Sequence, residues 1–302
     1  MHLPLDIFTH LMLYLDNPSQ KSLCLTSQDL VPICQSSLFR TMNCDLPYSQ
    51  DRRVQILQEF AALLPQSPHL ATYVRHLQYS FTRIDLTESQ LLSTVLKSLD
   101  RIEILTLSNR YHLEAPLIPD DLALSVLDTI RSPGLTRLYI GNLPMWFLRG
   151  VGVGLTSLTI HYSHKTKTRI EAKPTEQVES ALVTHEEGIM GRKIFLTSLR
   201  VEQHFLEAVR AFECGSLTKG PQSRLELSEL VDIQVNNLPL SFVEEVTTKA
   251  TKLKRLDWKS KPYLTLSSLF PAYLLSMKHS RFFCNLWMSF SHLYLSFKFH
   301  TH

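Results

Sequence analysis

Leu135-Thr136-Arg137-Leu138-Tyr139-Ile140-Gly141-Asn142 contains the phrase that decides the fold of this chain. Its pattern is apolar-x-x-apolar-x-apolar. The last three positions alternate with a period of two, which is typical of a short strand with one buried face. The phrase occurs seven times, beginning at Val74, Ile102, Leu135, Leu155, Leu196, Leu230 and Leu253. A phrase that returns along the chain indicates a repeat architecture.

Helical patterns lie before the phrases and between most of them. Amphipathic stretches cover residues 87–99, 119–131 and 239–251, and a linking helix is expected within residues 45–69. Successive phrases are 28, 33, 20, 41, 34 and 23 residues apart, so the repeat is irregular. We expect a single helical turn at 143–148 in the shortest step. The longest step holds an insertion near residues 163–195, with a helix at 175–183. Repeated strand–helix units predict an α/β fold, an irregular solenoid with a parallel sheet over residues 70–262.

The predicted strands have one apolar face and one polar face. In an ordinary α/β domain, the alternative, parallel strands are continuous apolar runs because both faces are buried. The alternation therefore favours a sheet with one open face. The side chains expected to bind a protein substrate there are Arg137, Tyr139, Thr159, His161, Arg200, Glu202, Gln234, Arg255 and Asp257. Because Tyr and Arg are frequent at binding hot spots, Arg137, Tyr139 and Arg200 are the first candidates. A solvated face that binds nothing remains the alternative.

Residues 1–44 have the pattern of three short helices. Apolar residues recur at helical spacing in the first, and Pro18 ends it. Ser19 can cap the second helix, and Ser27 or Asp29 can begin the third. About 40 residues is the lower limit for independent folding without staples, so this segment must pack on the rest of the chain, on a partner, or on both. Two interpretations of the segment remain open: a helical cap on a larger fold and an adaptor-binding module.

The order and spacing of these residues resemble the F-box motif over residues 3–44. The resemblance is carried by Leu3-Pro4, Ile7, Leu11, Tyr14-Leu15-Asp16, Leu23, Leu25, Ser27 and Leu38-Phe39. Gln20, Thr26 and Leu30 differ from the residues that are usual in that family. The resemblance implies docking on a Skp-type adaptor of a cullin–RING ubiquitin ligase. The residues that it implies for this contact are Leu3, Pro4, Ile7, Phe8, Leu11, Leu15, Leu23 and Leu25.

The repeat phrases resemble leucine-rich repeats, in the divergent form that often follows an F-box. Together the two resemblances imply a substrate-recognition subunit of a Skp–cullin–F-box type ubiquitin ligase. The adaptor would bind the N-terminal helices, and an unknown protein substrate would bind the sheet. Ligation chemistry would belong to the partner subunits, so the chain is predicted not to be an enzyme. Two other classes stay open: a leucine-rich-repeat scaffold without a ubiquitin role, and an enzyme whose site is assembled from dispersed residues.

The composition is that of a globular protein with a substantial core. The chain has 302 residues, of which 44% are hydrophobic and 20% charged. Its net charge of +3 predicts no nucleic-acid partner. Five cysteines without a CxxC pair are typical of buried free thiols, and no signal-peptide pattern is present, which predicts a cytoplasmic or nuclear protein. No nucleotide loop, nucleophile elbow or metal-ligand spacing occurs, so we expect no cofactor and no metal.

Residues 263–302 form an atypical tail that is rich in aromatic residues and lacks Asp and Glu. The stretch 282–297 has no formal charge, but it is shorter than a membrane span and is interrupted by polar residues. We therefore predict no membrane segment. Two interpretations of the tail stay open: a sequence translated past a missed splice site, and a helical C-terminal cap for the solenoid.

Overall fold

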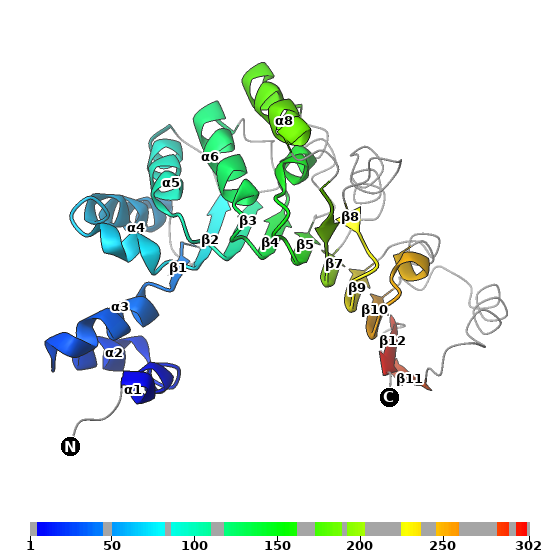
Figure 1. Ribbon diagram of the computed structural model, residues 1–302, viewed down its shortest axis with the longest axis horizontal. Helices are drawn as coiled ribbons and strands as arrows, with labels where there is room; N and C mark the ends of the chain where they lie inside the picture. Colours follow the sequence, from blue (N-terminus) through cyan, green and yellow to red (C-terminus); the bar gives the residue numbers. More distant parts are fainter. Residues whose placement is uncertain are drawn as a thin grey trace. The chain divides into compact units, whose positions relative to one another are not determined.

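The computed structural model of the protein forms two compact units. The first comprises Met1–Tyr111 and Pro116–Thr136, and the second comprises His112–Ala115 and Arg137–His302. The structure describes residues 5–44, 50–81, 86–109, 118–161, 173–188, 192–202, 225–236, 246–259, 283–289 and 294–300. The protein is a mixed α/β protein, and its two units together hold eight parallel strands that follow their order in the chain (Figure 1).

The first unit begins with a helical module. Its elements are α1 (Leu5–Leu11), α2 (Asn17–Cys24), the 3-10 helix η1 (Gln28–Leu30) and α3 (Val31–Leu38). Ser27 or Asp29 was predicted to begin the third helix, but Ser27 caps the preceding η1, where its hydroxyl oxygen accepts the backbone N–H of Asp29 at 3.3 Å, and α3 begins at Val31. The prediction that Ser19 caps the second helix is wrong. The Asp16 carboxylate accepts the backbone N–H of Ser19 at 2.9 Å, so α2 begins earlier and holds Pro18 in its first turn. Proline has no backbone N–H, and it is well accommodated there because the N–H groups of the first turn have no acceptor within the helix.

Three parallel strands of the first unit follow this module. They are β1 (Thr41–Asn43), β2 (His76–Phe81) and β3 (Ile104–Asn109), paired in that order. The helical elements between and after them are α4 (Gln50–Leu63), η2 (Pro68–Thr72), α5 (Leu86–Ser98) and α6 (Asp120–Arg131). Figure 1 shows α4, α5 and α6 along one side of these strands. The linking helix and the first two helices between phrases are therefore confirmed, whereas β1 was not predicted.

The second unit continues the same succession. Its parallel strands are β4 (Arg137–Gly141), β5 (Ser157–His161), β7 (Ser198–Glu202), β9 (Asp232–Asn236) and β10 (Arg255–Lys259). The short step between β4 and β5 holds only the 3-10 helix η3 (Met145–Gly150), and the insertion holds α8 (Glu176–Gly188), as expected. Residues 246–249 are helical within the third predicted helix. β6 (Ile194–Phe195) and β8 (Leu225–Glu226) form a separate parallel pair that was not predicted.

Burial follows the repeat phrase closely. In the first six phrases the three apolar positions are at most 2% exposed, and the residues between them in β3, β5 and β9 are half-buried. Each fully buried aliphatic side chain contributes roughly 1.5–3 kcal/mol relative to its exposed state. The strands therefore have one buried face, as the alternation predicted.

Backbone hydrogen bonds join the beginnings of neighbouring phrases. The carbonyl of Thr156 accepts the N–H groups of Thr197 and Ser198 at 2.8 and 3.2 Å, and the Thr197 hydroxyl donates to the same oxygen at 3.1 Å. The Thr197 carbonyl in turn accepts the N–H groups of Val231 and Asp232 at 2.9 and 3.1 Å. The first unit repeats this arrangement at the carbonyls of Arg40 and Arg75. Each phrase thus positions the start of the next.

The described part of the tail is a β-hairpin rather than the helix considered for a C-terminal cap. Strand β11 (Phe283–Ser289) pairs antiparallel with β12 (Tyr294–His300). The other residues of the tail from 260 onward lie outside the described part. Among the described helices, none combines the length and apolar character needed to cross a lipid bilayer.

Replacing a buried phrase leucine tests this core. Leu105 is fully buried, so Leu105→Ala should lower the free energy of unfolding of the full chain by about 2–5 kcal/mol, measured in urea. Leu86 is 68% exposed, and Leu86→Ala is the matched control, with a loss below about 0.5 kcal/mol. Equal losses for the two variants would contradict the burial described for β3.

Candidate functional site

The helical module has a very small core of its own. It consists of Met12, Leu30 and Cys34, which are 3%, 7% and 0% exposed. The partly buried side chains packed against it are Phe8, Leu15, Leu23, Cys24 and Ile33. Three of the residues predicted to bind an adaptor, namely Phe8, Leu15 and Leu23, therefore pack largely within the module.

Other apolar side chains of the module face solvent. Ile7, Leu11 and Leu25, all predicted adaptor residues, are 49%, 41% and 89% exposed. Leu13 and Tyr14 are 71% and 83% exposed, and neither was in the predicted set. Leu13 and Tyr14 follow the end of α1 at Leu11, so helical spacing does not apply to them. Leu3 and Pro4 lie outside the described residues.

Gln20, an unusual residue for the resembled motif, has a clear structural role. It is 5% exposed, and its Nε2 donates to the carbonyl oxygens of Met12 and Leu15, both at 2.9 Å. A buried amide that satisfies two carbonyls holds the turn after α1 against α2. Thr26, another unusual residue, donates through its hydroxyl to the Leu23 carbonyl at 2.8 Å and so helps to end α2.

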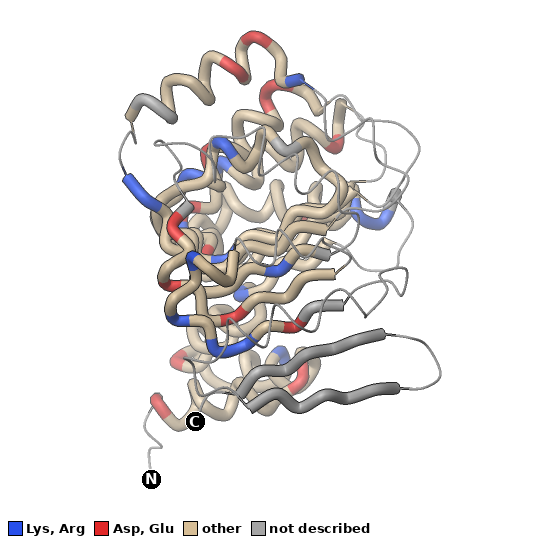
Figure 2. The backbone as a smooth tube through the Cα atoms, turned by 90° about the vertical axis from the view of Figure 1, so that its right-hand side faces the viewer, with Lys and Arg blue, Asp and Glu red and all other residues tan. Residues whose placement is uncertain are grey.

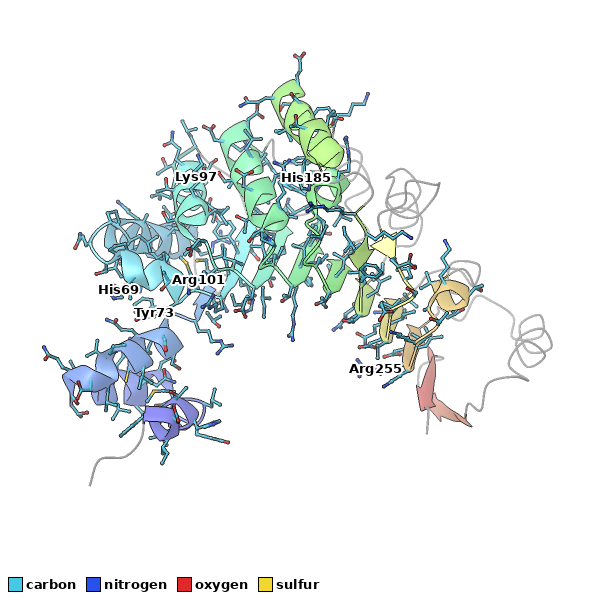
Figure 3. All side chains as sticks on the ribbon, viewed as in Figure 1. His69, Tyr73, Lys97, Arg101, His185 and Arg255 are labelled. Atoms are coloured by element: carbon cyan, nitrogen blue, oxygen red, sulfur yellow. The ribbon has the colours of Figure 1, made fainter. Side chains whose placement is uncertain are left out.

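The module contacts α4 and η2 through Gln35 of α3 and through Phe39, the residue that follows α3. The rings of Phe39 and Phe60 stack with centroids 6.5 Å apart. Gln35 Oε1 lies 3.2 Å from His69 Nε2, and the rings of His69 and Tyr73 meet edge to face at 5.9 Å. Figure 3 labels His69 and Tyr73, which lie close together where α3 approaches η2. These contacts show that the module packs on the sheet-bearing part of its own unit.

The register of the second unit aligns the predicted substrate residues. Tyr139 pairs with Thr159, Thr159 with Arg200, Arg200 with Gln234, and Gln234 with Asp257. Neighbouring strands of a sheet lie about 4.8 Å apart, so these five residues form one row across it. Arg200 is exposed, whereas Tyr139, Thr159 and Gln234 are half-buried.

The remaining predicted substrate residues lie beside this row. Arg137 is exposed, and it has no ion pair with another residue that the structure describes. His161 is half-buried and pairs in register with Glu202, whose side chain lies outside the described part. The polar residues of β4, β5 and β7 are thus brought together as predicted.

Two predicted residues of β10, Asp257 at the end of the row and Arg255 beside it, are less available than predicted. Asp257 is only 8% exposed and accepts a hydrogen bond from Gln234 Nε2 at 3.1 Å, so its predicted place on an open surface is wrong. Arg255, labelled in Figure 3, donates to both carboxylate oxygens of Asp232, with an Nε–Oδ1 distance of 2.7 Å. Hydrogen bonding to Asp232 raises the pKa of Arg255. Cross-strand pairing accounts for the reduced availability of Arg255, whereas Asp257 lies on a strand that β12 also contacts.

One buried group of titratable residues lies in the first unit. Tyr79 is fully buried, and its hydroxyl donates to the carboxylate of Glu88, which is 1% exposed. Burial, followed by the charge of Glu88, raises the pKa of Tyr79 far above its usual value. Because neither side chain reaches solvent, we interpret this pair as part of the core rather than as a reactive site.

Charged residues of both signs are mixed along the described part of the chain. Figure 2 shows Lys and Arg interspersed with Asp and Glu, without a continuous basic stripe in the part of the chain that the structure describes. Among these same residues, no group of three His, Cys, Asp or Glu side chains could hold a metal ion.

Comparison with models of known protein families gives no match for this chain, and no curated protein is significantly similar to it. The functional argument therefore depends on the geometry of the module and of the sheet.

The buried amide of Gln20 provides a test of the module. Gln20→Ala leaves the Met12 and Leu15 carbonyls without this donor, which should destabilise the module by about 1–3 kcal/mol. Amide hydrogen exchange of α1 and α2 in the full chain measures this loss. Gln28 is exposed, and Gln28→Ala should leave the exchange rates within about twofold of the original. Unchanged protection in Gln20→Ala would disprove the role assigned to this side chain.

Proposed function

We propose that this chain is a substrate-recognition subunit of a Skp–cullin–F-box type ubiquitin ligase. The observation that carries the proposal is the exposed apolar surface of the N-terminal module. Ile7, Leu11, Leu13, Tyr14 and Leu25 are between 41% and 89% exposed, and they surround the small apolar core of Met12, Leu30 and Cys34. A concentration of large exposed apolar side chains on a small module is typical of a protein interface. The proposed occupant is a Skp-type adaptor.

The sheet-bearing part of the protein is proposed to be an irregular solenoid of leucine-rich-repeat type. The burial of all three apolar positions in successive phrases supports this proposal, as do the helices along one side of the strands. Repeats of this kind present an extended surface to a partner. The hydrogen bonds from one phrase start to the next support a succession of equivalent units.

The proposed substrate site is the row of polar side chains on β4, β5, β7 and β9. Exposed Arg137 and Arg200 provide positive charge, and half-buried Tyr139 provides an aromatic anchor. Arginine guanidinium groups bind carboxylates with two parallel hydrogen bonds, so we expect acidic side chains in the bound segment of the substrate. Gln234 supplies the polar border of this site, and its side chain is held by a hydrogen bond to the buried Asp257 of β10.

Ligation chemistry is proposed to reside in the partner subunits, with this chain acting as a binding protein in the cytoplasm or nucleus and needing no cofactor. A repeat scaffold without a ubiquitin role is the second candidate. It is favoured by the packing of Phe8, Leu15 and Leu23 within the module and by the ring stacking of Phe39 on Phe60. A helical cap that binds no adaptor would need these same contacts with the rest of the chain.

A charge placed on the exposed apolar surface distinguishes these two candidates. Leu11→Asp would bury an unpaired carboxylate in the adaptor interface, and recovery of a purified Skp-type adaptor in a pull-down should fall by about 100-fold or more. The circular dichroism spectrum should remain native, because Leu11 is 41% exposed.

Val183 of α8 provides a matched control for this change, since it is also apolar and 41% exposed. Val183→Asp should leave adaptor recovery unchanged. Undiminished adaptor binding by Leu11→Asp would reject the proposed adaptor surface and favour the scaffold.

Substrate recognition is tested separately on the sheet. Combined replacement of Arg137, Tyr139 and Arg200 by Ala should abolish capture of substrate proteins while adaptor binding is retained. Truncating hot-spot residues of this type commonly costs about 2 kcal/mol or more each. Arg192 is also exposed, and Arg192→Ala is the control that should leave both activities intact. Retention of substrate capture by the triple variant would place recognition elsewhere, including the insertion near 163–195.

A further inference from the structure

Charge is distributed unevenly along this chain. Residues 249–302 contain nine Lys and Arg and a single acidic residue, Asp257, which gives them a net charge of +8. Residues 1–248 contain 22 Lys and Arg and 27 Asp and Glu, which gives them a net charge of −5. The net charge of +3 for the whole chain conceals this difference. A strong charge asymmetry between two parts of a chain is typical of proteins that bind an anionic surface through the basic part.

Three lysines of this basic segment are exposed in the structure. Lys249, Lys252 and Lys254 all lie shortly before β10. Lys252 Nζ lies 2.6 Å from Glu229 Oε2, but this ion pair is at the surface, where such pairs are weak and screened by salt. Lys252 can therefore exchange this partner for another anion. Asp257, the one acidic residue of the segment, is only 8% exposed, so the exposed charge near β10 is mostly positive.

The hairpin of β11 and β12 lies beside these lysines. Strand β12 contacts β10, and Figure 1 shows the two strands next to each other. Trp287 and Tyr294, one on each strand of the hairpin, are residue types that are enriched at the boundary between a membrane and water. Alternate residues of a strand share a face, so the register places three apolar pairs on one face of the hairpin. These pairs are Cys284 with Phe299, Leu286 with Phe297, and Met288 with Leu295.

We propose that Lys249, Lys252, Lys254 and the β11–β12 hairpin form a docking surface for an anionic lipid bilayer. This inference goes beyond the proposed function and does not rest on it. The lysines attract the negatively charged headgroups, and the hairpin provides apolar and aromatic residues that enter the boundary between headgroups and acyl chains. Binding of this kind grows with both the apolar area and the electrostatic attraction, and the protein lies on the bilayer without crossing it.

Nucleic acids are also anionic, but the hairpin favours a lipid surface. Single-stranded nucleic acids bind where aromatic rings stack on successive bases. Half of the residues in the three apolar pairs are Leu286, Met288 and Leu295, which offer no flat ring to a base but suit the acyl chains of a lipid. A duplex is bound through a basic patch or stripe, and Figure 2 shows no continuous basic stripe in the described part of the chain.

Sedimentation of the full chain with lipid vesicles tests the docking surface. We expect binding to vesicles of phosphatidylcholine with phosphatidylserine to be about tenfold or more tighter than binding to vesicles of phosphatidylcholine alone. Replacing the three lysines together by Glu should weaken binding to the anionic vesicles by about 100-fold or more, because each basic residue near such a surface contributes about fivefold. The matched control replaces Lys97, Arg101 and Lys193 by Glu. These cations are also exposed, Lys193 is likewise ion-paired, and this control should bind within about threefold of the original chain.

Tryptophan fluorescence of the full chain then tests the role of the hairpin. Anionic vesicles should shift the emission to shorter wavelength, because the Trp287 indole leaves water. Trp287→Phe should retain the binding and lose this shift, since the ring remains apolar but the indole is absent. Undiminished vesicle binding by the triple lysine variant would overturn the proposal, as would an equal loss in the control variant. Emission of the original chain that does not shift would overturn it as well, and so would binding of a single-stranded oligonucleotide in place of the anionic vesicles.

Discussion

The structure depends on the burial of three apolar side chains in each of the first six repeat phrases. In β4, for example, Leu138 and Ile140 are buried against the helical side, and this forces Tyr139 to the other face. A shift of one residue would exchange the two faces, so the register is strongly constrained. The same constraint in β5 and β7 aligns Thr159 and Arg200 with Tyr139. The proposed substrate surface is therefore a consequence of how the core is packed.

Much of this arrangement could be predicted, because successive side chains of a strand point to opposite faces and the alternation of apolar residues therefore shows which face is buried. All seven strands expected from the phrases are present, as are the single turn at η3 and the helix α8 of the insertion. Strands β1, β6 and β8 were missed because two or three residues are too few to show alternation. Asp257 was misplaced because its burial depends on what packs beside β10, and the alternation of apolar residues does not show that β12 contacts this strand.

The N-terminal module combines a small core with a large exposed apolar surface. Its helices are short, so they cannot bury all of their apolar side chains against one another. Met12, Leu30 and Cys34 are buried, and Leu11 and Leu25 remain exposed to solvent. The buried amide of Gln20 adds to the stability of this small module, because it donates hydrogen bonds to two carbonyls of the preceding turn. The pattern of exposed residues was only partly predictable: the apolar character was evident, but the division between core and surface depended on the tertiary packing.

The central claim is that the module recruits a ligase and the sheet recruits its substrate. Affinity capture from cell extract with mass spectrometry, performed with the full chain and with a chain lacking residues 1–38, which keeps β1 in the sheet, tests this most directly. We predict that a Skp-type adaptor and a cullin accompany the full chain and are lost on deletion, while a common set of other proteins remains with both. Absence of adaptor and cullin from the full-chain sample would contradict the account, and so would their equal recovery with the shortened chain.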